Sequence, residues 1–400
     1  MSSMDGLFFD QAVAVGNRRD RELASGVTTS RFVEANAIEG LIPEWHQLAA
    51  GAVEANPFFE ADFLIAAARN LAPSGTRFLT VRNDDGKLIA LVPVRTHPSA
   101  LVVPTASVWA HDYGPVGAPL IDAQSPEAAS GLLHALTATG RVAVFPYLPL
   151  AGAAATALVG AAWRDKLPIG LASQHERAMI QEGEVEGDIR RSLPTKRRKE
   201  FARQMRRLGE LGAVTIETVS ETAAVRAGFE EFLALEAKGW KGEGGTALAS
   251  SEATRKFALE IVSRLSAIDC CRVSAIRVDD RAVAMLVTIL SADTAYSWKI
   301  AFDEAFARFS PGAQLMLEAA SALLAESGVQ RIDSLASADH PMIDHLWRGR
   351  RVMGTLVVGP EGGKLRQRMV AGALRSNAWL RGTAKAALAT FKKRETGEPT

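Results

Sequence analysis

Cysteine is scarce in this chain: Cys270 and Cys271 are the only two among 400 residues. They are adjacent in a strand-like run, where successive side chains point to opposite faces, so a disulfide between them would be strained. This usage favours a reducing compartment over an oxidising one, where structural disulfides are common. The sequence therefore excludes a fold that is held together by disulfides.

Long uncharged apolar runs are also missing, so the sequence predicts no membrane-spanning helix. The first residues carry acid early, and no basic segment is followed by a long apolar run, which argues against a secretory signal. We interpret the protein as soluble and cytoplasmic. Residues 1–30 are expected to form a loose leader, and residues 373–400 a basic, Ala-rich tail.

The sequence also lacks an excess of charge of one sign: it has 46 Lys and Arg and 45 Asp and Glu, which gives a formal charge of +1. No global field therefore draws the protein to DNA or to a membrane surface, and any such attraction must be local. Apolar residues make up 48% of the chain and charged residues 23%, which is ordinary globular composition. The length suggests two domains.

The second half alternates strands and helices in an order that can be followed along the sequence. Residues 214–219 alternate like a strand, and three further strands over 271–278, 282–290 and 294–301 follow one another without a helix between them. The short turns between these three imply an antiparallel meander. Ser310-Pro311-Gly312 then opens a helix through about residue 326, since Ser suits the cap and Pro the first helical position.

The first half repeats this order more faintly, which suggests a tandem duplication. A strand and two helices precede a hairpin around Asn83-Asp84-Asp85-Gly86, and Ser125-Pro126 starts a helix as Ser310-Pro311 does later. We therefore expect an α/β (α+β) protein of two domains, over residues 31–180 and 181–372. Each is expected to hold a mixed, largely antiparallel sheet flanked by helices.

Three stretches of the second half resemble a known family: LALEAKGWKGEGGTAL (233–248), WKIAFDEAFARFSPG (298–312) and DHPMIDHLWRGRR (339–351). They look like the CelD-type, cellulose-biosynthesis-associated acetyltransferases of the GNAT superfamily. This group is related to the Fem-type transferases, which pair two GNAT-like domains. The resemblance is strong over residues 190–358 and weak over residues 31–180. It implies tandem GNAT-like acyl-CoA N-acyltransferase domains, of which the N-terminal one is degenerate.

The resemblance also implies a place for a thioester donor. In a GNAT fold the donor's phosphates meet the backbone N–H groups at the start of the helix after the fourth strand, where unpaired amides and the helix dipole attract anions. In this chain that corner consists of Arg308, Phe309, Ser310, Gly312, Ala313 and Gln314.

The corner departs from the usual GNAT motif, which has two closely spaced glycines. Here Gly312 stands alone and Pro311 removes one amide donor. Acetyl-CoA or another acyl-CoA is the implied donor, while an acyl carrier protein stays open as the alternative. A well-formed helix start without a ligand is the structural alternative.

Glu236 is the first general-base candidate. It falls on the apolar stripe of its helix together with Phe229, Phe232 and Leu233, so we expect its carboxylate to be desolvated. Desolvation raises a carboxyl pKa, and a base poised nearer neutrality can take the proton from an attacking amine or hydroxyl. A structural ion pair with a neighbour such as Lys241 is the alternative.

Asp303 is the second base candidate because it ends the fourth strand beside the donor corner, with a solvated loop acid as the alternative. His340 is predicted to be a substrate contact or proton shuttle, and Asp339 the cap of a short helix over residues 341–347. The His and Asp residues of this stretch lack the spacing of a zinc site, so we expect no metal.

The residues expected to bind the acceptor flank the base candidates in sequence: Trp240, Lys241, Trp298 and Lys299. Covalent catalysis has little support, because no G-x-S-x-G motif occurs and neither cysteine lies in an electropositive setting. We therefore expect direct transfer between donor and acceptor.

The run RRSLPTKRRKEFARQMRR (190–207) carries nine basic residues and a single acid, Glu200. From Thr195 onward it can form a helix with Phe201, Met205 and Leu208 as its buried stripe. A solvated helix face is the structural interpretation. The functional ones are contact with an acidic acyl carrier protein, with tRNA or with anionic lipid.

These features predict an acyltransferase that transfers groups other than aminoacyl groups. Its acceptor would be a small molecule or saccharide, such as the amine or hydroxyl of a sugar, amino sugar, exopolysaccharide or cell-envelope precursor. Two alternatives stay open. One is a Fem-like transferase that uses aminoacyl-tRNA, and the other is a non-catalytic GNAT pair that serves as a binding or scaffold module.

Overall fold

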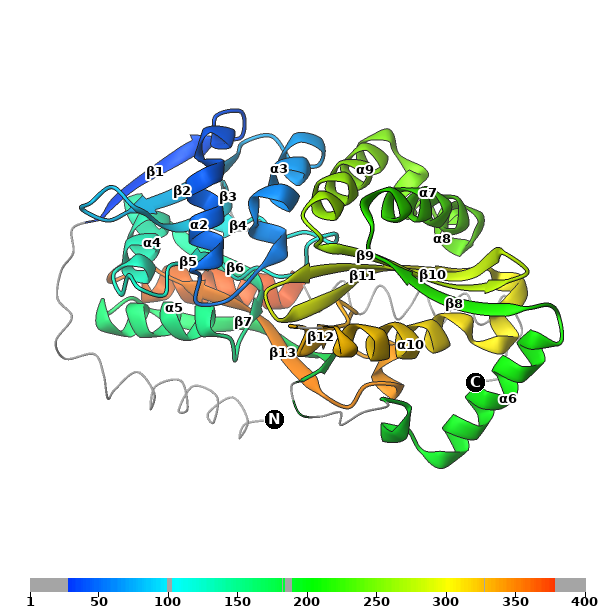
Figure 1. The fold of residues 1–400 in the computed structure, drawn as a ribbon. Helices are drawn as coiled ribbons and strands as arrows, with labels where there is room; N and C mark the ends of the chain where they lie inside the picture. Colours follow the sequence, from blue (N-terminus) through cyan, green and yellow to red (C-terminus); the bar gives the residue numbers. More distant parts are fainter. Residues whose placement is uncertain (1–27, 99–102, 182, 184–188, 327, 378–400) are drawn as a thin grey trace. The chain divides into compact units, whose positions relative to one another are not determined.

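The computed structural model describes residues 28–98, 103–181, 183, 189–326 and 328–377. The described chain divides into two compact units (Figure 1). Unit 1 is built from the described parts of residues 1–54, 75–175 and 352–400, and unit 2 from residues 55–74 and 176–351. Both are mixed α/β structures in which a largely antiparallel sheet is flanked by helices, as predicted.

The sheet of unit 2 follows the order β7-β12-β11-β10-β9-β8. Its pairings are antiparallel except that of β11 with β12, which is parallel. The strands are β7 (Ile169–Ile180, of which residues 176–180 belong to unit 2), β8 (Val214–Val219), β9 (Cys271–Val278), β10 (Arg281–Ser291), β11 (Thr294–Phe302) and β12 (Arg331–Asp333). The predicted meander is confirmed to within one residue at each strand end.

The tight turn between β9 and β10 explains why the sequence predicts the meander correctly. Asp279 and Asp280 both have positive φ, 46° and 66°. A two-residue hairpin turn matched to the strand twist requires this conformation, which Asp tolerates better than most residues. The pair Asp-Asp is therefore a sound turn signal.

Helices cover both faces of this sheet. They are α3 (Ala61–Asn70), α6 (Thr195–Gly209), α7 (Thr222–Lys238), α8 (Trp240–Glu243), α9 (Glu252–Ala267) and α10 (Pro311–Ala325), with short 3-10 turns η2 (Pro57–Phe59), η4 (Ile189–Ser192), η5 (Leu248–Ser250), η6 (Glu304–Phe309) and η7 (Ile343–His345). In Figure 1, α7 and α9 lie on one side of the strands and α10 on the other. The core therefore consists of two layers, one on each face.

Helix α3 belongs to unit 2 although it lies among the elements of the first half in sequence. It packs on α9, with the rings of Phe63 and Phe257 5.5 Å apart and Arg69 bonded to Glu260 at 2.8 Å. The two continuous domains expected from the sequence, which meet at residue 180, would place α3 in the first domain instead. An apolar helix face indicates burial, but it does not specify which sheet the helix covers.

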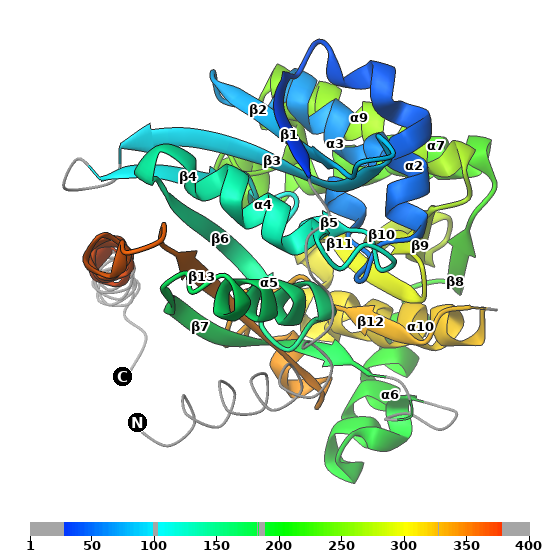
Figure 2. The same ribbon diagram turned by 90° about the vertical axis from the view of Figure 1, so that its left-hand side faces the viewer.

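The sheet of unit 1 follows the order β1-β2-β3-β4-β6-β13, with β5 paired to β3. The strands are β1 (Thr29–Glu34), β2 (Thr76–Arg82), β3 (Leu88–Pro98), β4 (Pro104–Val108), β5 (Leu120–Ile121), β6 (Val142–Pro149) and β13 (Arg350–Val358, of which residues 352–358 belong to unit 1). The helices are η1 (Ile38–Leu41), α2 (Ile42–Ala50), α4 (Ala128–Thr137), η3 (Ala138–Gly140) and α5 (Ala153–Arg164), and residues 364–377 are also helical. Figure 2 shows α4 and α5, which pack on each other.

The two units repeat one strand-pairing scheme. In each unit, four strands that follow one another along the chain form an antiparallel meander, β1 to β4 and β8 to β11. The fourth strand of each meander then pairs in parallel with a fifth strand of the sheet, β4 with β6 and β11 with β12. The last strands are exchanged along the chain: β7, from the first half, pairs with β12, while β13, from the second half, pairs with β6. The sequence order thus predicts the repeat, but the compact units are not the continuous domains 31–180 and 181–372.

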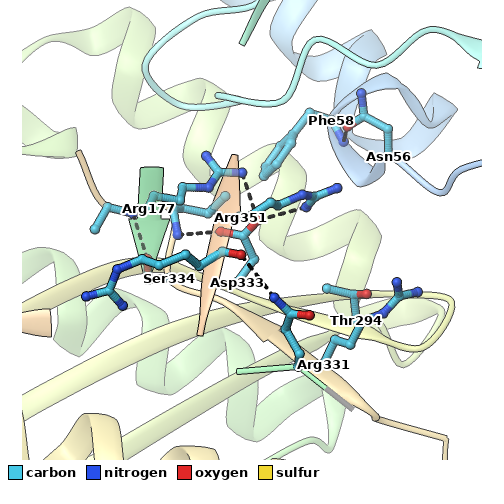
Figure 3. A network of polar contacts seen from close by, with 12 residues as sticks. Asn56, Phe58, Arg177, Thr294, Arg331, Asp333, Ser334 and Arg351 are labelled. Carbon is cyan, nitrogen blue, oxygen red and sulfur yellow. Dashed lines mark hydrogen bonds and ion pairs between the residues drawn. The ribbon is translucent and has the colours of Figure 1, made fainter. Parts of the chain in front are cut away.

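A buried ion cluster joins three strand segments of unit 2. Asp333 is 0% exposed, and its Oδ2 accepts hydrogen bonds from Arg177 at 2.7 Å and from Arg351 at 2.8 Å. Its Oδ1 accepts a bond from the Leu335 amide at 2.9 Å. Figure 3 shows both guanidinium groups directed at the one carboxylate. Two cations thus share a single buried anion.

The local charges decide the protonation of this cluster. Burial acts to raise the pKa of the Asp333 carboxyl, but Arg177, Arg351 and the Leu335 amide overcome it and hold that pKa below its ordinary value. Burial also lowers the pKa of the Arg177 guanidinium, which an arginine tolerates without losing its charge near neutral pH. Asp333 is therefore the counter-charge on which the buried Arg177 depends.

We expect Asp333→Asn to reduce the free energy of unfolding by about 3–5 kcal/mol, because two cations then lose their buried partner. The carboxylate's contribution is fully present above about pH 4 and is lost as the pH falls through the lowered pKa of Asp333. Urea unfolding of both proteins between neutral and acid pH measures this, with exposed Asp84→Asn as the control. A stability difference that is independent of pH down to acid unfolding would contradict the assignment.

Candidate functional site

The separation of β11 from β12 creates the central feature of unit 2. The two strands pair at three positions only, Thr294–Tyr296 opposite Arg331–Asp333. β11 continues to Phe302 alongside β10, so its residues 297–302 have no parallel partner among the strands that the structure describes. In this part of β11, Lys241 donates to the Ile300 carbonyl at 2.7 Å. The strands thus separate where the sequence places the donor corner.

Helix α10 begins directly beside this separation. The Gln314 amide donates to the Ser310 carbonyl at 3.1 Å, whereas the Gly312 and Ala313 amides have no acceptor among the residues that the structure describes. Pro311 carries no N–H. Two donors at the positive end of a fifteen-residue helix are therefore available for an anion.

The sequence correctly places Ser310 at the N-cap of α10, but the expected side-chain cap is wrong. Ser310 also closes η6, where its N–H donates to the Ala307 carbonyl at 2.9 Å, and it has the left-handed conformation with φ 51°. A capping side chain needs the extended backbone conformation to reach the first-turn amides. Ser310 makes no such bond, so the amides are not capped from within.

Gly312 lies close to two other segments of unit 2, the end of β11 and the loop after β12. A Cβ atom at this position would lie 3.5 Å from Phe302 Cδ1, 3.6 Å from Ile300 Cδ1 and 3.8 Å from Met342 Sδ. These are ordinary van der Waals distances, so an alanine fits and a larger side chain does not. The contacts bring the loop that holds His340 and Met342 next to the start of α10.

The other residues of the corner have distinct environments. Gln314 is fully buried; its Nε2 donates to the Phe309 carbonyl at 3.0 Å, and its Oε1 has no partner among the described residues. Phe309 and Ala313 are buried, whereas Arg308 is exposed with its guanidinium over the Phe309 ring. A buried acceptor, two free amides and an exposed cation thus gather at one helix start.

Glu236 lies on α7 and is 3% exposed, which confirms that the acid falls on the buried stripe of its helix. Its Oε1 accepts a bond from Lys241 at 3.1 Å, and its Oε2 accepts from the Leu248 amide at 2.8 Å. Both oxygens are therefore engaged. The ion pair with Lys241, which the sequence offered as the alternative to a catalytic role, is present.

Helix α8 is anchored to the donor corner by Glu304, the first residue of η6. Glu304 Oε1 accepts a bond from the Trp240 amide at 2.6 Å. The indole of Trp240 is 59% exposed, and the Lys241 ammonium lies 5.9 Å from its ring centre. Trp240 thus presents an exposed aromatic ring beside a cation that bonds to β11, and their role in acceptor binding stays a prediction.

Asp303 connects the end of β11 to η6 and is bound on both sides. Its Oδ1 accepts a bond from the Ala305 amide at 3.0 Å, and its Oδ2 pairs with Arg281. The Asp303 side chain is 19% exposed and that of Arg281 65% exposed. Asp303 is thus less deeply buried than Glu236, and its ionic partner reaches into water.

Trp298 differs from the expectation for an acceptor-binding residue. It is 6% exposed and packs among the rings of Phe63, Phe229 and Phe257, with centroid distances of 6.2–6.5 Å. The strand alternation directs its ring to the face of the sheet that α7 and α9 cover, so Trp298 contributes to the core. The Lys299 ammonium lies 6.0 Å from the centre of the same ring.

The loop after β12 is less regular than predicted. Asp339 has φ 55° and caps no helix, since the short turn η7 (Ile343–His345) starts after Met342. His340 is half-buried, and its Nδ1 accepts a weak bond from the Met342 amide at 3.3 Å. In the described part of the chain, no three His, Cys, Asp or Glu residues come together as metal ligands.

Cys270 and Cys271 are free thiols, and burial raises the pKa of Cys271 to about 12. A thiol of that pKa stays protonated near neutral pH and is a poor nucleophile. The described helices include none that is both long and apolar enough to cross a membrane.

The segment that holds these residues matches a family model described as an acetyltransferase (GNAT) domain, over residues 195–340. Unit 2 therefore contains a GNAT acetyltransferase domain. The match spans α6, the meander, α10 and β12, so it covers the separation of β11 from β12. The match supports a transferase of acyl groups, and GNAT domains in general use acyl-CoA as donor.

Solved structures similar to the chain include FemX, with 10% identity, a TM-score of 0.50 and coverage of 79% of this chain and 95% of FemX. A conserved protein of unknown function from Bacteroides thetaiotaomicron has 10% identity, a TM-score of 0.51 and coverage of 80% and 97%. The C-terminal domain of a putative lysylphosphatidylglycerol synthetase from Agrobacterium fabrum has 14% identity, a TM-score of 0.49 and coverage of 84% and 97%. At such identities the likeness concerns the fold alone, and a comparison with curated proteins gives no match.

The comparisons support the GNAT domain and the Fem-like fold, but the CelD-type assignment stays a prediction. The exclusion of aminoacyl groups has no support, because FemX shares the fold. Sequence reasoning placed Glu304 beside the donor corner but missed Arg281 and Met342 as neighbours of the site. No local pattern in the sequence marks either of these two residues.

We expect Glu236→Ala to lower the free energy of unfolding by about 2–4 kcal/mol, because Lys241 loses its counter-charge and the Leu248 amide its acceptor. Glu236→Gln keeps an oxygen for Leu248 and should cost less. Chemical denaturation measures both, with the exposed Glu243→Ala as control, expected within about 0.5 kcal/mol of the parent protein. Equal losses for Glu236→Ala and Glu243→Ala would show that the pair does not stabilise this helix.

Proposed function

We propose that the GNAT domain of unit 2 moves an acetyl or acyl group from a thioester to an amine or hydroxyl of a sugar, amino sugar or cell-envelope precursor. The observation that carries this proposal is the pair of unbonded amides, Gly312 and Ala313, at the start of α10 beside the separating strands. A donor phosphate fits these amides. The pantetheine chain would follow the half of β11 that has no parallel partner, with the thioester toward residue 300.

In the reaction, the acceptor nitrogen or oxygen attacks the thioester carbonyl. A C–N or C–O bond forms and the C–S bond breaks, so the donor leaves as a thiolate. The proton lost by the acceptor passes to a protein base and from there reaches the leaving sulfur. Such direct transfer needs no covalent enzyme intermediate and no redox partner.

We propose Asp303 or Glu236 as the base, with His340 as a proton relay. The contacts favour Asp303, because the guanidinium of Arg281 is 65% exposed and can move into water, which frees one carboxylate oxygen. Both oxygens of Glu236 are held by partners, and its side chain is only 1% exposed. In this arrangement Glu236 fixes Lys241, whose ammonium lies against Ile300.

The acceptor would bind on the surface formed by α8. The exposed indole of Trp240, next to Lys241 in the chain, can stack on the apolar face of a sugar ring. Lys241 and Lys299 would contact anionic groups of a phosphorylated precursor. A saccharide acceptor is therefore the acceptor class that these side chains favour.

Gly312→Trp should abolish donor binding, since its indole cannot fit between Ile300, Phe302 and Met342 and must cover the first turn of α10. Gly312→Ala is the matched control, because its Cβ meets only ordinary contacts. Calorimetric titration with acetyl-CoA and longer acyl-CoA esters measures the effect. Retained affinity in Gly312→Trp would place the donor elsewhere.

Asp303→Asn should reduce kcat by about 10²–10⁴-fold with little change in donor affinity, as expected for the loss of a general base. Glu236→Gln should change kcat much less. Steady-state kinetics on the acceptor found by screening separates the two residues. Normal turnover of the double variant would disprove carboxylate catalysis at this site.

A second candidate is Fem-like aminoacyl transfer from tRNA. It is favoured by the basic helix α6, and the fold shared with FemX is compatible with it. Steep, salt-dependent retention of tRNA would support it, because counterions are released when phosphates are bound. Failure to bind any thioester or tRNA would instead favour a scaffold role.

A further inference from the structure

Helix α6 exposes a continuous basic face. Its members recur every three or four residues and so lie on one side of the helix: Lys196, Lys199, Arg203, Arg206 and Arg207. Arg203 pairs with Glu200, the only acid of the helix. The other four are exposed, and none of them forms an ion pair with any described residue. We call these five residues the α6 basic face.

The opposite side of α6 fixes the helix to the donor corner. Phe201 and Leu208 are buried in the core that also contains Phe309 and Ala313. Gln204 donates to the Arg308 carbonyl at 3.3 Å, which ties α6 to η6, the turn that leads into α10. The exposed Arg308 side chain is therefore carried by the same turn that anchors the basic face. The basic face lies on the other side of α6 from these contacts, about one helix diameter of 10–12 Å away.

The face is better suited to a protein than to a membrane or an RNA. An interfacial helix needs an apolar side to insert into lipid, and here the apolar side is already buried. RNA binding usually involves a broad basic surface, whereas this chain has a formal charge of +1 and α6 is about 22 Å long. A short row of cations matches one acidic helix of a small protein.

We propose that the α6 basic face docks an acidic carrier protein that delivers the acyl group as a phosphopantetheine thioester. This inference rests on the proposed function, since it names the donor for the same corner. A carrier docked on α6 would present its phosphopantetheine arm to η6 and the start of α10. The arm carries one phosphate, for which the two amides of Gly312 and Ala313 are sufficient.

A carrier-borne donor would explain why the donor corner, Ser310-Pro311-Gly312, lacks the second glycine of the usual GNAT motif. Free coenzyme A carries three phosphates and depends on the glycine-rich loop of that motif for much of its binding. A carrier-borne donor gains its affinity from protein contacts at α6 instead. After transfer, the C–S bond has broken, the acceptor holds the acyl group, and the carrier leaves with a free thiol that has taken up the proton.

The test uses the full chain and a purified acidic acyl carrier protein loaded with acetyl-phosphopantetheine. The docking variant is Lys199→Glu with Arg206→Glu, and the matched control is Arg255→Glu with Lys256→Glu on α9, which changes the charge equally. The control residues are exposed and form only surface ion pairs, with Glu230 and Glu252. A charge-keeping variant, Lys199→Arg with Arg206→Lys, guards against a folding defect.

Binding is measured by calorimetry at low and at physiological salt. We expect the docking variant to bind the acetyl-carrier at least about tenfold more weakly, and the control and charge-keeping variants to bind as the parent does. The parent's affinity should also fall as salt rises. Equal affinity in the docking variant and the parent would overturn the inference.

Parallel titrations of the parent with acetyl-CoA, tRNA and phosphatidylglycerol vesicles separate the remaining outcomes. Binding of acetyl-CoA without binding of the acetyl-carrier overturns this inference and leaves the proposed function standing. Binding of neither thioester overturns the proposed function as well. Retention of tRNA or of vesicles that is lost in the docking variant, without carrier binding, assigns the face to that partner and overturns the inference.

Discussion

The chemistry of unit 2 depends on one constraint, the shortness of the parallel pairing between β11 and β12. Three paired positions hold the strands together, and the rest of β11 has β10 as its only described strand partner beyond them. An unpaired backbone edge needs other hydrogen-bond partners, and Lys241 supplies one at the Ile300 carbonyl. Because α10 starts at the same place, the open strand and the first amides of α10 lie together where we propose that the donor binds. A longer β12 would close the site.

The buried cluster at Asp333 explains how so short a strand stays in place. β12 contributes only Arg331–Asp333 to the sheet, so its backbone bonds alone fix it weakly. The Asp333 carboxylate adds bonds to Arg177 and Arg351, which come from the two strands that are exchanged between the units along the chain. A buried charge cluster costs desolvation, and removing one partner leaves an uncompensated buried charge. Only this register of β7 and β12 supplies the counter-charge.

Local patterns in the sequence predict what is local in the structure. The meander, the basic helix and the Glu236–Lys241 pair follow from alternation, helical spacing and neighbouring charges. The placement of α3, the exchange of β7 and β13, and the Arg177–Asp333 pair depend on contacts between residues more than a hundred positions apart. One sequence carries no signal for such contacts. The expectation for Trp298 differs from the structure because an aromatic residue within a strand is compatible both with the core and with a ligand contact. Ser310 was misread because its backbone conformation is set by η6, not by its own preference.

The same division between local and distant determinants bears on the donor. A glycine-rich loop would bind a coenzyme's phosphates through backbone amides alone, and its absence can be read directly in Ser310-Pro311-Gly312. What compensates for it cannot be read there, because α6 lies a hundred residues earlier and joins the corner through Gln204 and Arg308. Four exposed cations of the α6 basic face form no ion pair with a described residue, so they are open to an acidic partner. Under the proposed carrier docking, the corner would orient the donor and α6 would supply its affinity, so that the two segments act on different steps of donor binding.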